Sequence, residues 1–164
     1  MIKLYTDQPI PQGLDERIAS GELHSLFLAG PSPRVPEVLS WRVEAVQILA
    51  DLNYEGLVFL PEWTSFDSQV DYATQTAWEL FGLKACRRIV FWIPRSETLP
   101  GATTNVEFGL WVEDNRSIYG RPDEAPGNEY LDYIYRTRCY RKPYNDLRNL
   151  LDDAINNRTK TCNS

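Results

Sequence analysis

Two patterns of apolar residues alternate along the chain. Short runs that are almost wholly apolar predict buried strands, and longer segments with apolar residues at three- and four-residue steps predict amphipathic helices. The predicted strands are residues 23–29, 56–60, 89–93 and 117–120, with residues 2–6 as an additional edge strand. The predicted helices are residues 36–51, 71–85, 104–113, 128–140 and 144–156, and helix is favoured over strand for the tyrosine-rich 128–140.

This succession predicts an α/β fold. Strands that alternate with helices form a mainly parallel sheet with right-handed crossovers, so we expect a three-layer sandwich of the flavodoxin-like or Rossmann-like type. The first long helix should begin with Pro36, since proline is favoured in a first helical turn. A chain of 164 residues fills one core and is short for two ordinary domains, so residues 1–164 are interpreted as one domain with its core at about 24–156.

Composition and charge narrow the possible partners. An apolar fraction of 43% is typical of a soluble globular protein, and no run approaches the ~20 apolar residues that span a membrane. The net charge of −6 argues against a polymeric nucleic acid. The N-terminus lacks a secretory signal, and Cys86, Cys139 and Cys162 show no CxxC spacing, so we expect a cytoplasmic protein without disulfides.

Several common chemistries are not supported by the sequence. The single histidine, His24, begins an apolar run, which argues against a Ser-His-Asp triad or a histidine-rich metal site. Neither a GxGxxG fingerprint nor a P-loop lysine motif is present, so dinucleotide binding and NTP hydrolysis lose support. We therefore expect neither a cofactor nor a metal.

Polar and aromatic residues follow several of the predicted strands. The carboxyl ends of parallel strands meet at one edge of a sheet, where ligands bind, so the loops at 30–34, 61–63, 94–95 and 119–122 should lie together. Glu107 should join them from the next helix, and two interpretations of it are open. Thr104-x-x-Glu107 fits a capping box, in which the glutamate only stabilises a helix end. Alternatively, Glu107 is a reactive carboxylate.

Four stretches, taken in order, resemble a known family. LFLAGPSPR, DYATQTAWE, IVFWIPR and LPGATTNVEFGLW together resemble the nucleoside 2-deoxyribosyltransferase-like family, over about residues 26–122. The resemblance implies a parallel-sheet fold, cleavage of the N-glycosidic bond of a nucleoside or nucleotide, and a glutamate nucleophile in an E-x-G segment. Here that nucleophile is Glu107. The residue type suits the chemistry, because a carboxylate can attack an anomeric carbon and form a glycosyl-enzyme.

The resemblance also implies a second acid on the middle helix, which contacts the sugar or helps to protonate the departing base. Glu79 occupies that position, where aspartate is usual, and a solvated helix face is the alternative for it. Gly101 stands where classical transferases carry an aspartate. Phe27 stands where they commonly carry a tyrosine, and it can pack but cannot orient a carboxylate.

Substrate contacts are expected from the loops. The resemblance implies that Ser32 and Arg34 contact the sugar or a 5′-substituent, with ordinary loop residues as the alternative. Trp63 is a candidate for stacking on a base, although core packing is favoured for tryptophans in general. The remaining expected substrate-binding residues are Gly30, Pro31, Phe27, Arg95, Thr104 and Asn105.

The leading hypothesis is an enzyme that transfers the sugar of a 2′-deoxynucleoside to another base through a covalent intermediate on Glu107. One alternative is a nucleoside 5′-monophosphate N-glycosidase, in which water replaces the acceptor base and Arg34 or Arg95 holds the phosphate. Another is a noncatalytic nucleotide-binding module. The expected partners are a small-molecule nucleoside or nucleotide and further copies of the chain in a homo-oligomer.

Overall fold

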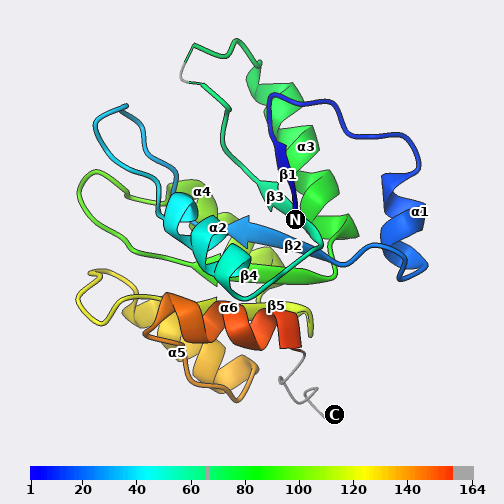
Figure 1. Ribbon diagram of the computed structural model, residues 1–164. Coiled ribbons are helices and arrows are strands. Elements are labelled where there is room, and N and C mark those ends of the chain that lie inside the picture. Colours follow the sequence, from blue (N-terminus) through cyan, green and yellow to red (C-terminus); the bar gives the residue numbers. More distant parts are fainter. Residues whose placement is uncertain (66, 157–164) are drawn as a thin grey trace.

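The computed structural model describes residues 1–65 and 67–156, and within them five strands form one parallel sheet in the order β1-β3-β2-β4-β5 (Figure 1). The strands are β1 (Ile2–Tyr5), β2 (Ser25–Ala29), β3 (Leu57–Leu60), β4 (Arg88–Trp92) and β5 (Ser117–Gly120). The predicted α/β sandwich is confirmed. The segment at 2–6 also forms the edge strand that its apolar pattern predicts.

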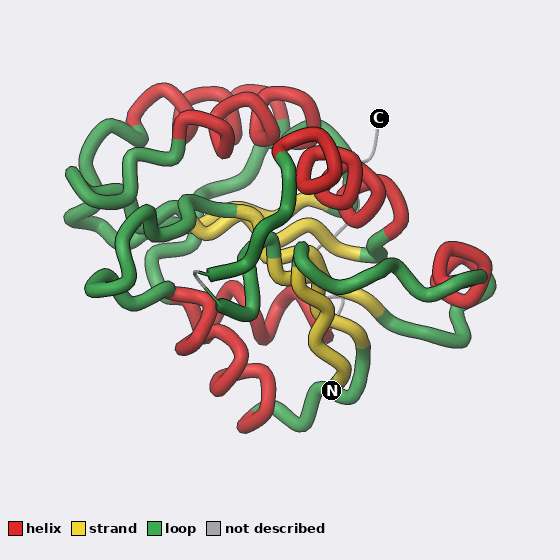
Figure 2. The backbone as a smooth tube through the Cα atoms, turned by 90° about the horizontal axis from the view of Figure 1, so that it is seen from above, coloured by secondary structure: helices red, strands yellow, loops and turns green. Residues whose placement is uncertain are grey.

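Helices cover both faces of this sheet (Figure 2). They are α1 (Leu14–Ala19), α2 (Trp41–Asp51), α3 (Tyr72–Ala85), α4 (Ala102–Trp111), α5 (Glu129–Arg138) and α6 (Leu147–Asn156). Side chains alternate along β2, so that Leu26 and Leu28 pack with α2 and α6, whereas Phe27 and Ala29 pack in the core that α1, α3, α4 and α5 cover. Two apolar layers therefore enclose the sheet.

The helix predicted at 36–51 begins later than expected. Ser40 is its N-cap, with a side chain that accepts a hydrogen bond from the amide of Arg42, and Trp41 is the first helical residue. The prediction that Pro36 starts this helix is wrong. A serine cap satisfies a free helical amide, which a proline four residues earlier cannot do.

The start of α4 contradicts the capping-box interpretation. Gly101 is the residue before the helix, and its φ of 66° lies in the left-handed region. Thr104 is inside the first turn, buried to 3% exposure, and Glu107 lies in the second turn. Glu107 is therefore not a cap. The helix dipole favours an ionised carboxylate only in the first turn, and Glu107 lies beyond that turn.

Two helices near the ends of the described chain also differ from the prediction. Helix α1 was not predicted from the sequence, because its 6 residues bury only Leu14 and Ile18 and are too few for a helical period to be visible. The last helix begins at Leu147 and not at Tyr144, whose backbone instead forms a bridge with Gly120.

The cysteine prediction is tested only in part. Cys86 and Cys139 are buried free thiols, and Cys162 lies outside the described residues. Among the residues that the structure describes, no helix has the length and apolar character to cross a membrane.

Candidate active site

Glu107 on α4 and Glu79 on α3 interact electrostatically. Burial, and secondly the negative charge of Glu79, raise the pKa of Glu107 to about 7, and the positive charge of Arg42 opposes this shift. Burial also raises the pKa of Glu79, against a hydrogen bond that its Oε1 accepts from Nε2 of Gln75 at 2.9 Å and against the charge of Arg42. Because the charge of Glu79 contributes to the raised pKa of Glu107, Glu79 is ionised when Glu107 titrates, and the ionised form of Glu107 gains population as pH rises through about 7.

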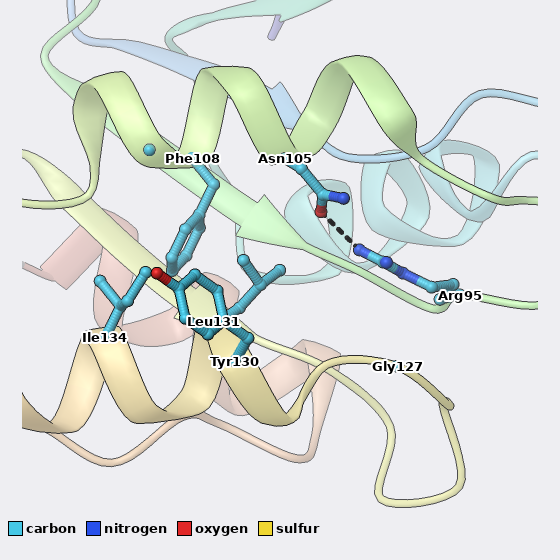
Figure 3. Close-up of a pocket in the computed structure, with 8 residues that line it drawn as sticks. Arg95, Asn105, Phe108, Gly127, Tyr130, Leu131 and Ile134 are labelled. Atoms are coloured by element: carbon cyan, nitrogen blue, oxygen red, sulfur yellow. Dashed lines mark hydrogen bonds between the residues drawn. The ribbon is translucent and has the colours of Figure 1, made fainter.

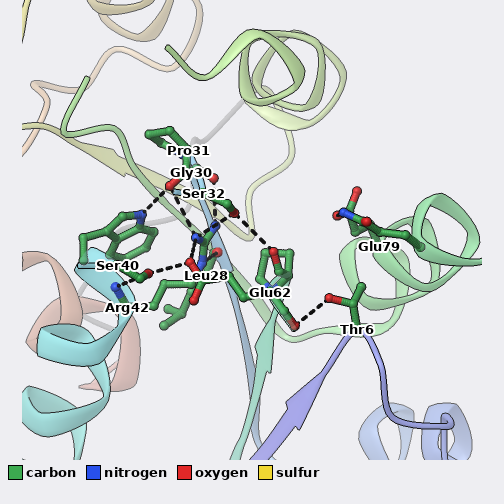
Figure 4. A network of polar contacts seen from close by, with 12 residues as sticks. Thr6, Leu28, Gly30, Pro31, Ser32, Ser40, Arg42, Glu62 and Glu79 are labelled. Atoms are coloured by element: carbon green, nitrogen blue, oxygen red, sulfur yellow. Dashed lines mark hydrogen bonds and ion pairs between the residues drawn. The ribbon is translucent and has the colours of Figure 1, made fainter. Parts of the chain in front are cut away.

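Arg42 is the most heavily bonded side chain near this pair (Figure 4). It lies in the first turn of α2 and its side chain is only 1% exposed. Its guanidinium donates hydrogen bonds to the carbonyl oxygens of Leu28 at 2.9 Å, Gly30 at 2.7 Å and Pro31 at 3.4 Å, to Oγ of Ser32 at 3.1 Å, and to Oε1 of Glu62 at 2.7 Å. One arginine thus fixes the backbone of the loop that follows β2.

Close packing holds the same loop from outside. A Cβ at Gly30 would lie 2.1 Å from the carbonyl oxygen of Trp92 and 2.8 Å from the ring of Trp41, so only glycine fits there. Nε1 of Trp41 donates to the carbonyl oxygen of Pro31 at 3.1 Å. The hydroxyl of Ser32 donates to the carbonyl oxygen of Pro61 at 3.2 Å, which joins the loops after β2 and β3.

Glu62 connects this network to the ends of two more strands. Its carboxylate accepts hydrogen bonds from Arg42 and from the hydroxyl of Ser40. Its carbonyl oxygen accepts from the amide of Thr6 at 3.0 Å and from the Thr6 hydroxyl at 2.7 Å. The carboxyl ends of β1, β2 and β3 are therefore linked beside the two acids.

Neither Arg42 nor a role for Glu62 was predicted from the sequence. One signal was available, because Arg42 lies three and seven residues before Ala45 and Leu49, on the apolar stripe of the predicted helix. An arginine on a buried helical face needs acceptors nearby. The sequence alone does not show that these acceptors are the carbonyls of the preceding loop.

Phe27 and Trp63 have different surroundings. Phe27 is wholly buried on β2, with its ring 6.2 Å from that of Phe59 and 6.3 Å from that of Trp78. Through Trp78 it packs against α3, the helix that carries Glu79. Trp63 is 38% exposed in the loop after β3, so its ring is available to a ligand.

The two candidate arginines also differ. Arg34 is exposed in the loop after β2, whereas Arg95 is partly buried and donates from Nη2 to Oδ1 of Asn105 at 2.6 Å. Asn105 and Glu107 are two residues apart on a helix, so their side chains project about 200° apart. Arg95 and Asn105 therefore lie on the flank of α4 that faces α5 (Figure 3), and Glu107 lies on another side.

The raised pKa of Glu107 predicts a pH-dependent cost in stability. Between its ordinary pKa of 4.5 and the folded value of about 7, the folded protein holds a proton that the unfolded chain has released. The free energy of unfolding should therefore fall as pH rises through this window, by about 3 kcal/mol from this group. Urea unfolding should show Glu107→Gln to be more stable than wild type at pH 8, with most of this advantage gone at pH 5. An equal difference at both pH values would contradict a raised pKa.

Metal chemistry has no obvious set of ligands in this site. Within residues 1–65 and 67–156, no three His, Cys, Asp or Glu side chains gather closely enough to hold a metal ion. The polar groups that converge here are instead two carboxylates, one buried guanidinium and the fixed loop after β2.

Comparison with known proteins agrees with the motifs. The family model described as nucleoside 2-deoxyribosyltransferase like matches residues 23–125. The matched range contains both acids, Arg42, Glu62 and the loop after β2. No curated protein matches the chain significantly.

Proposed function

The chain belongs to the nucleoside 2-deoxyribosyltransferase-like family, and on this premise we propose that it cleaves the N-glycosidic bond of 2′-deoxynucleosides and transfers the sugar to another base. The observation that carries the proposal is the pair of interacting acids, Glu107 and Glu79, on adjacent helices of the matched region. A lone surface glutamate would not have a pKa near 7. A pair of carboxylates at the reacting sugar is typical of enzymes that cleave glycosidic bonds.

In the proposed reaction, Glu107 is the nucleophile and ionised Glu79 accepts a hydrogen bond from a sugar hydroxyl. An oxygen of ionised Glu107 bonds to C1′ of the sugar as the bond from C1′ to the base nitrogen breaks, and the departing nitrogen takes a proton from water. A nitrogen of the acceptor base then attacks C1′, releases Glu107, and gives its own proton back to the solvent. Two inversions at C1′ retain the configuration of the substrate.

The substrate is proposed to lie against the loop after β2. The Arg42 network fixes the backbone of Gly30, Pro31 and Ser32, so this loop presents a preorganised surface to the sugar. Trp63 can stack on the base, and Arg34 can reach a 5′-substituent. Thr104 is buried and lies three residues before Glu107 on α4.

One observation favours hydrolysis as the second candidate. At Gly101 the positive φ is strained for any other residue, and a Cβ would lie 3.3 Å from Pro31. This position therefore suits glycine and supplies no carboxylate, although classical transferases carry an aspartate there. With one fewer contact for an acceptor base, water becomes a stronger competitor for the glycosyl-enzyme.

Sugar-labelled substrates test the proposal and separate these outcomes. The protein would be incubated with deoxynucleosides and their 5′-monophosphates, each with and without a free acceptor base. Labelled sugar in a new nucleoside supports transfer. Release of free sugar at one rate regardless of acceptor, with no new nucleoside, supports the glycosidase. No cleavage of any substrate would contradict both and leave the binding module.

Substitution of Arg34 tests whether the substrate carries a phosphate. If it does, Arg34→Ala removes a charge-assisted contact and should weaken binding of the 5′-monophosphate about 10- to 150-fold. Binding of the unphosphorylated nucleoside should change little. Equal losses for both ligands would assign Arg34 to the sugar pocket, and no loss for either would contradict any contact with the substrate. Titration of the inactive Glu107→Gln protein measures both affinities without turnover.

A further inference from the structure

A cavity of about 190 Å³ lies between α4 and α5 (Figure 3). Phe108, Leu131 and Ile134 form its apolar wall, and the exposed ring of Tyr130 lies at its rim. Arg95 supplies a guanidinium at one end. The cavity is thus apolar along its length and positively charged at one point.

The guanidinium of Arg95 lacks an anionic partner in the described part of the chain. Its hydrogen-bond acceptor is the neutral amide oxygen of Asn105. Its Nε is buried and, among the described residues, has no hydrogen-bond partner. A partly buried cation is costly when no acceptor satisfies it. By contrast, the equally cationic Arg121 forms an ion pair with Asp132 at 2.8 Å. An anion in the cavity would supply the negatively charged partner that the described residues do not give to Arg95.

Gly109 is the second independent feature of this cavity. It lies inside α4, where glycine is unfavourable, and a Cβ there would meet nothing within 4 Å. The glycine inside α3 has a steric reason, because a Cβ at Gly82 would lie 2.8 Å from the ring of Phe27. Gly109 also belongs to the E-x-G segment, and because it has no side chain the cavity is open beside Phe108.

We propose that this cavity binds a small organic anion, one aromatic ring carrying a carboxylate or a phosphate. The anionic group lies on Arg95, and the ring lies in the apolar part beside Gly109. The size is suitable, since an apolar cavity of about 150 Å³ holds benzene. The cavity is on a different side of α4 from Glu107, so this site does not depend on the proposed function.

The test uses four probes and two-dimensional amide NMR of the full chain. Phenyl phosphate and benzoate carry both a ring and a charge, benzyl alcohol lacks the charge, and inorganic phosphate lacks the ring. At least one of the ring-bearing anions should shift the amide signals of α4 and α5, with a Kd at least about tenfold lower than those of the other two probes. The stronger of the two identifies the preferred anionic group.

Two variants test the two halves of the site. Arg95→Met should weaken binding of the preferred anion about 10- to 150-fold, and Gly109→Leu should abolish binding by filling the cavity. Val106→Leu is the matched control, because Val106 is exposed on the same helix and does not line the cavity. Gly109→Ala checks folding and should raise Tm by about 2–4 °C. The proposal is overturned if no probe shifts α4 and α5, or if neither Arg95→Met nor Gly109→Leu changes the affinity.

Discussion

Replacing Glu107 with glutamine should lower kcat/KM by about 10³-fold or more while the protein stays folded. Glutamine has nearly the same size but cannot form the covalent bond to the sugar. Because Glu107 is not a helix cap, its loss leaves the end of α4 intact. The measurement is turnover of the best deoxynucleoside at pH 8, where most of wild-type Glu107 is ionised, together with circular dichroism.

A matched control is available shortly beyond the same helix. Glu113 is exposed and its Oε1 lies 3.7 Å from Nε of Arg138, so Glu113→Gln should leave kcat/KM nearly unchanged. Near-wild-type turnover by Glu107→Gln would mean that the nucleophile lies elsewhere. Wild-type kcat/KM should fall about tenfold per pH unit below the pKa of Glu107. Glu79→Gln should move this acid limb to lower pH, because the charge of Glu79 raises that pKa.

The second large effect concerns Arg42. Arg42→Met should destabilise the fold by about 3–5 kcal/mol, because it leaves the carboxylate of Glu62 without its cation and removes the donors that satisfy three loop carbonyls. The two side chains are only 1% and 17% exposed, so water cannot fully replace the lost contacts. Urea unfolding at constant pH measures the change.

Arg17 is the matched control for that experiment. Its ion pair with Glu22 has the same N–O distance of 2.7 Å, but the two side chains are 49% and 61% exposed. Arg17→Met should therefore cost less than about 1 kcal/mol. Equal effects of the two substitutions would contradict the view that burial makes the Arg42 network important. The double variant Arg42→Met with Glu62→Gln should lose less than Arg42→Met alone, since it also removes the unpaired charge.

The sheet could be predicted because each strand carries its own signal. The apolar run at 89–93 needs no partner to be visible, and β4 was found at Arg88–Trp92. The first residues of the helices were harder to predict from the sequence, because they depend on single backbone and capping contacts. Helix α2 follows the N-cap Ser40 and does not begin at the predicted Pro36. Helix α4 follows Gly101, whose backbone is left-handed, and so begins before the predicted Thr104.

Some residues of the candidate site could also be predicted from the sequence, and others could not. Glu107 and Glu79 are in recognisable motifs, so the sequence predicts them as a pair. Arg42 is different, because its acceptors are backbone carbonyls, which every residue has and no motif identifies. Arg95 and Asn105 were expected at the substrate. The direction in which α4 presents them becomes visible only when α5 is placed beside it.

The covalent intermediate is the most direct test of the central claim that Glu107 attacks the sugar. Protein mixed with an excess of deoxynucleoside would be quenched in acid within milliseconds to seconds, and its intact mass and peptides measured. We expect a mass increase of one deoxyribosyl group, on the peptide that contains Glu107, and no increase in Glu107→Gln. Rapid turnover with no adduct at any time point, or an adduct on another residue, would contradict the role of Glu107 as the nucleophile.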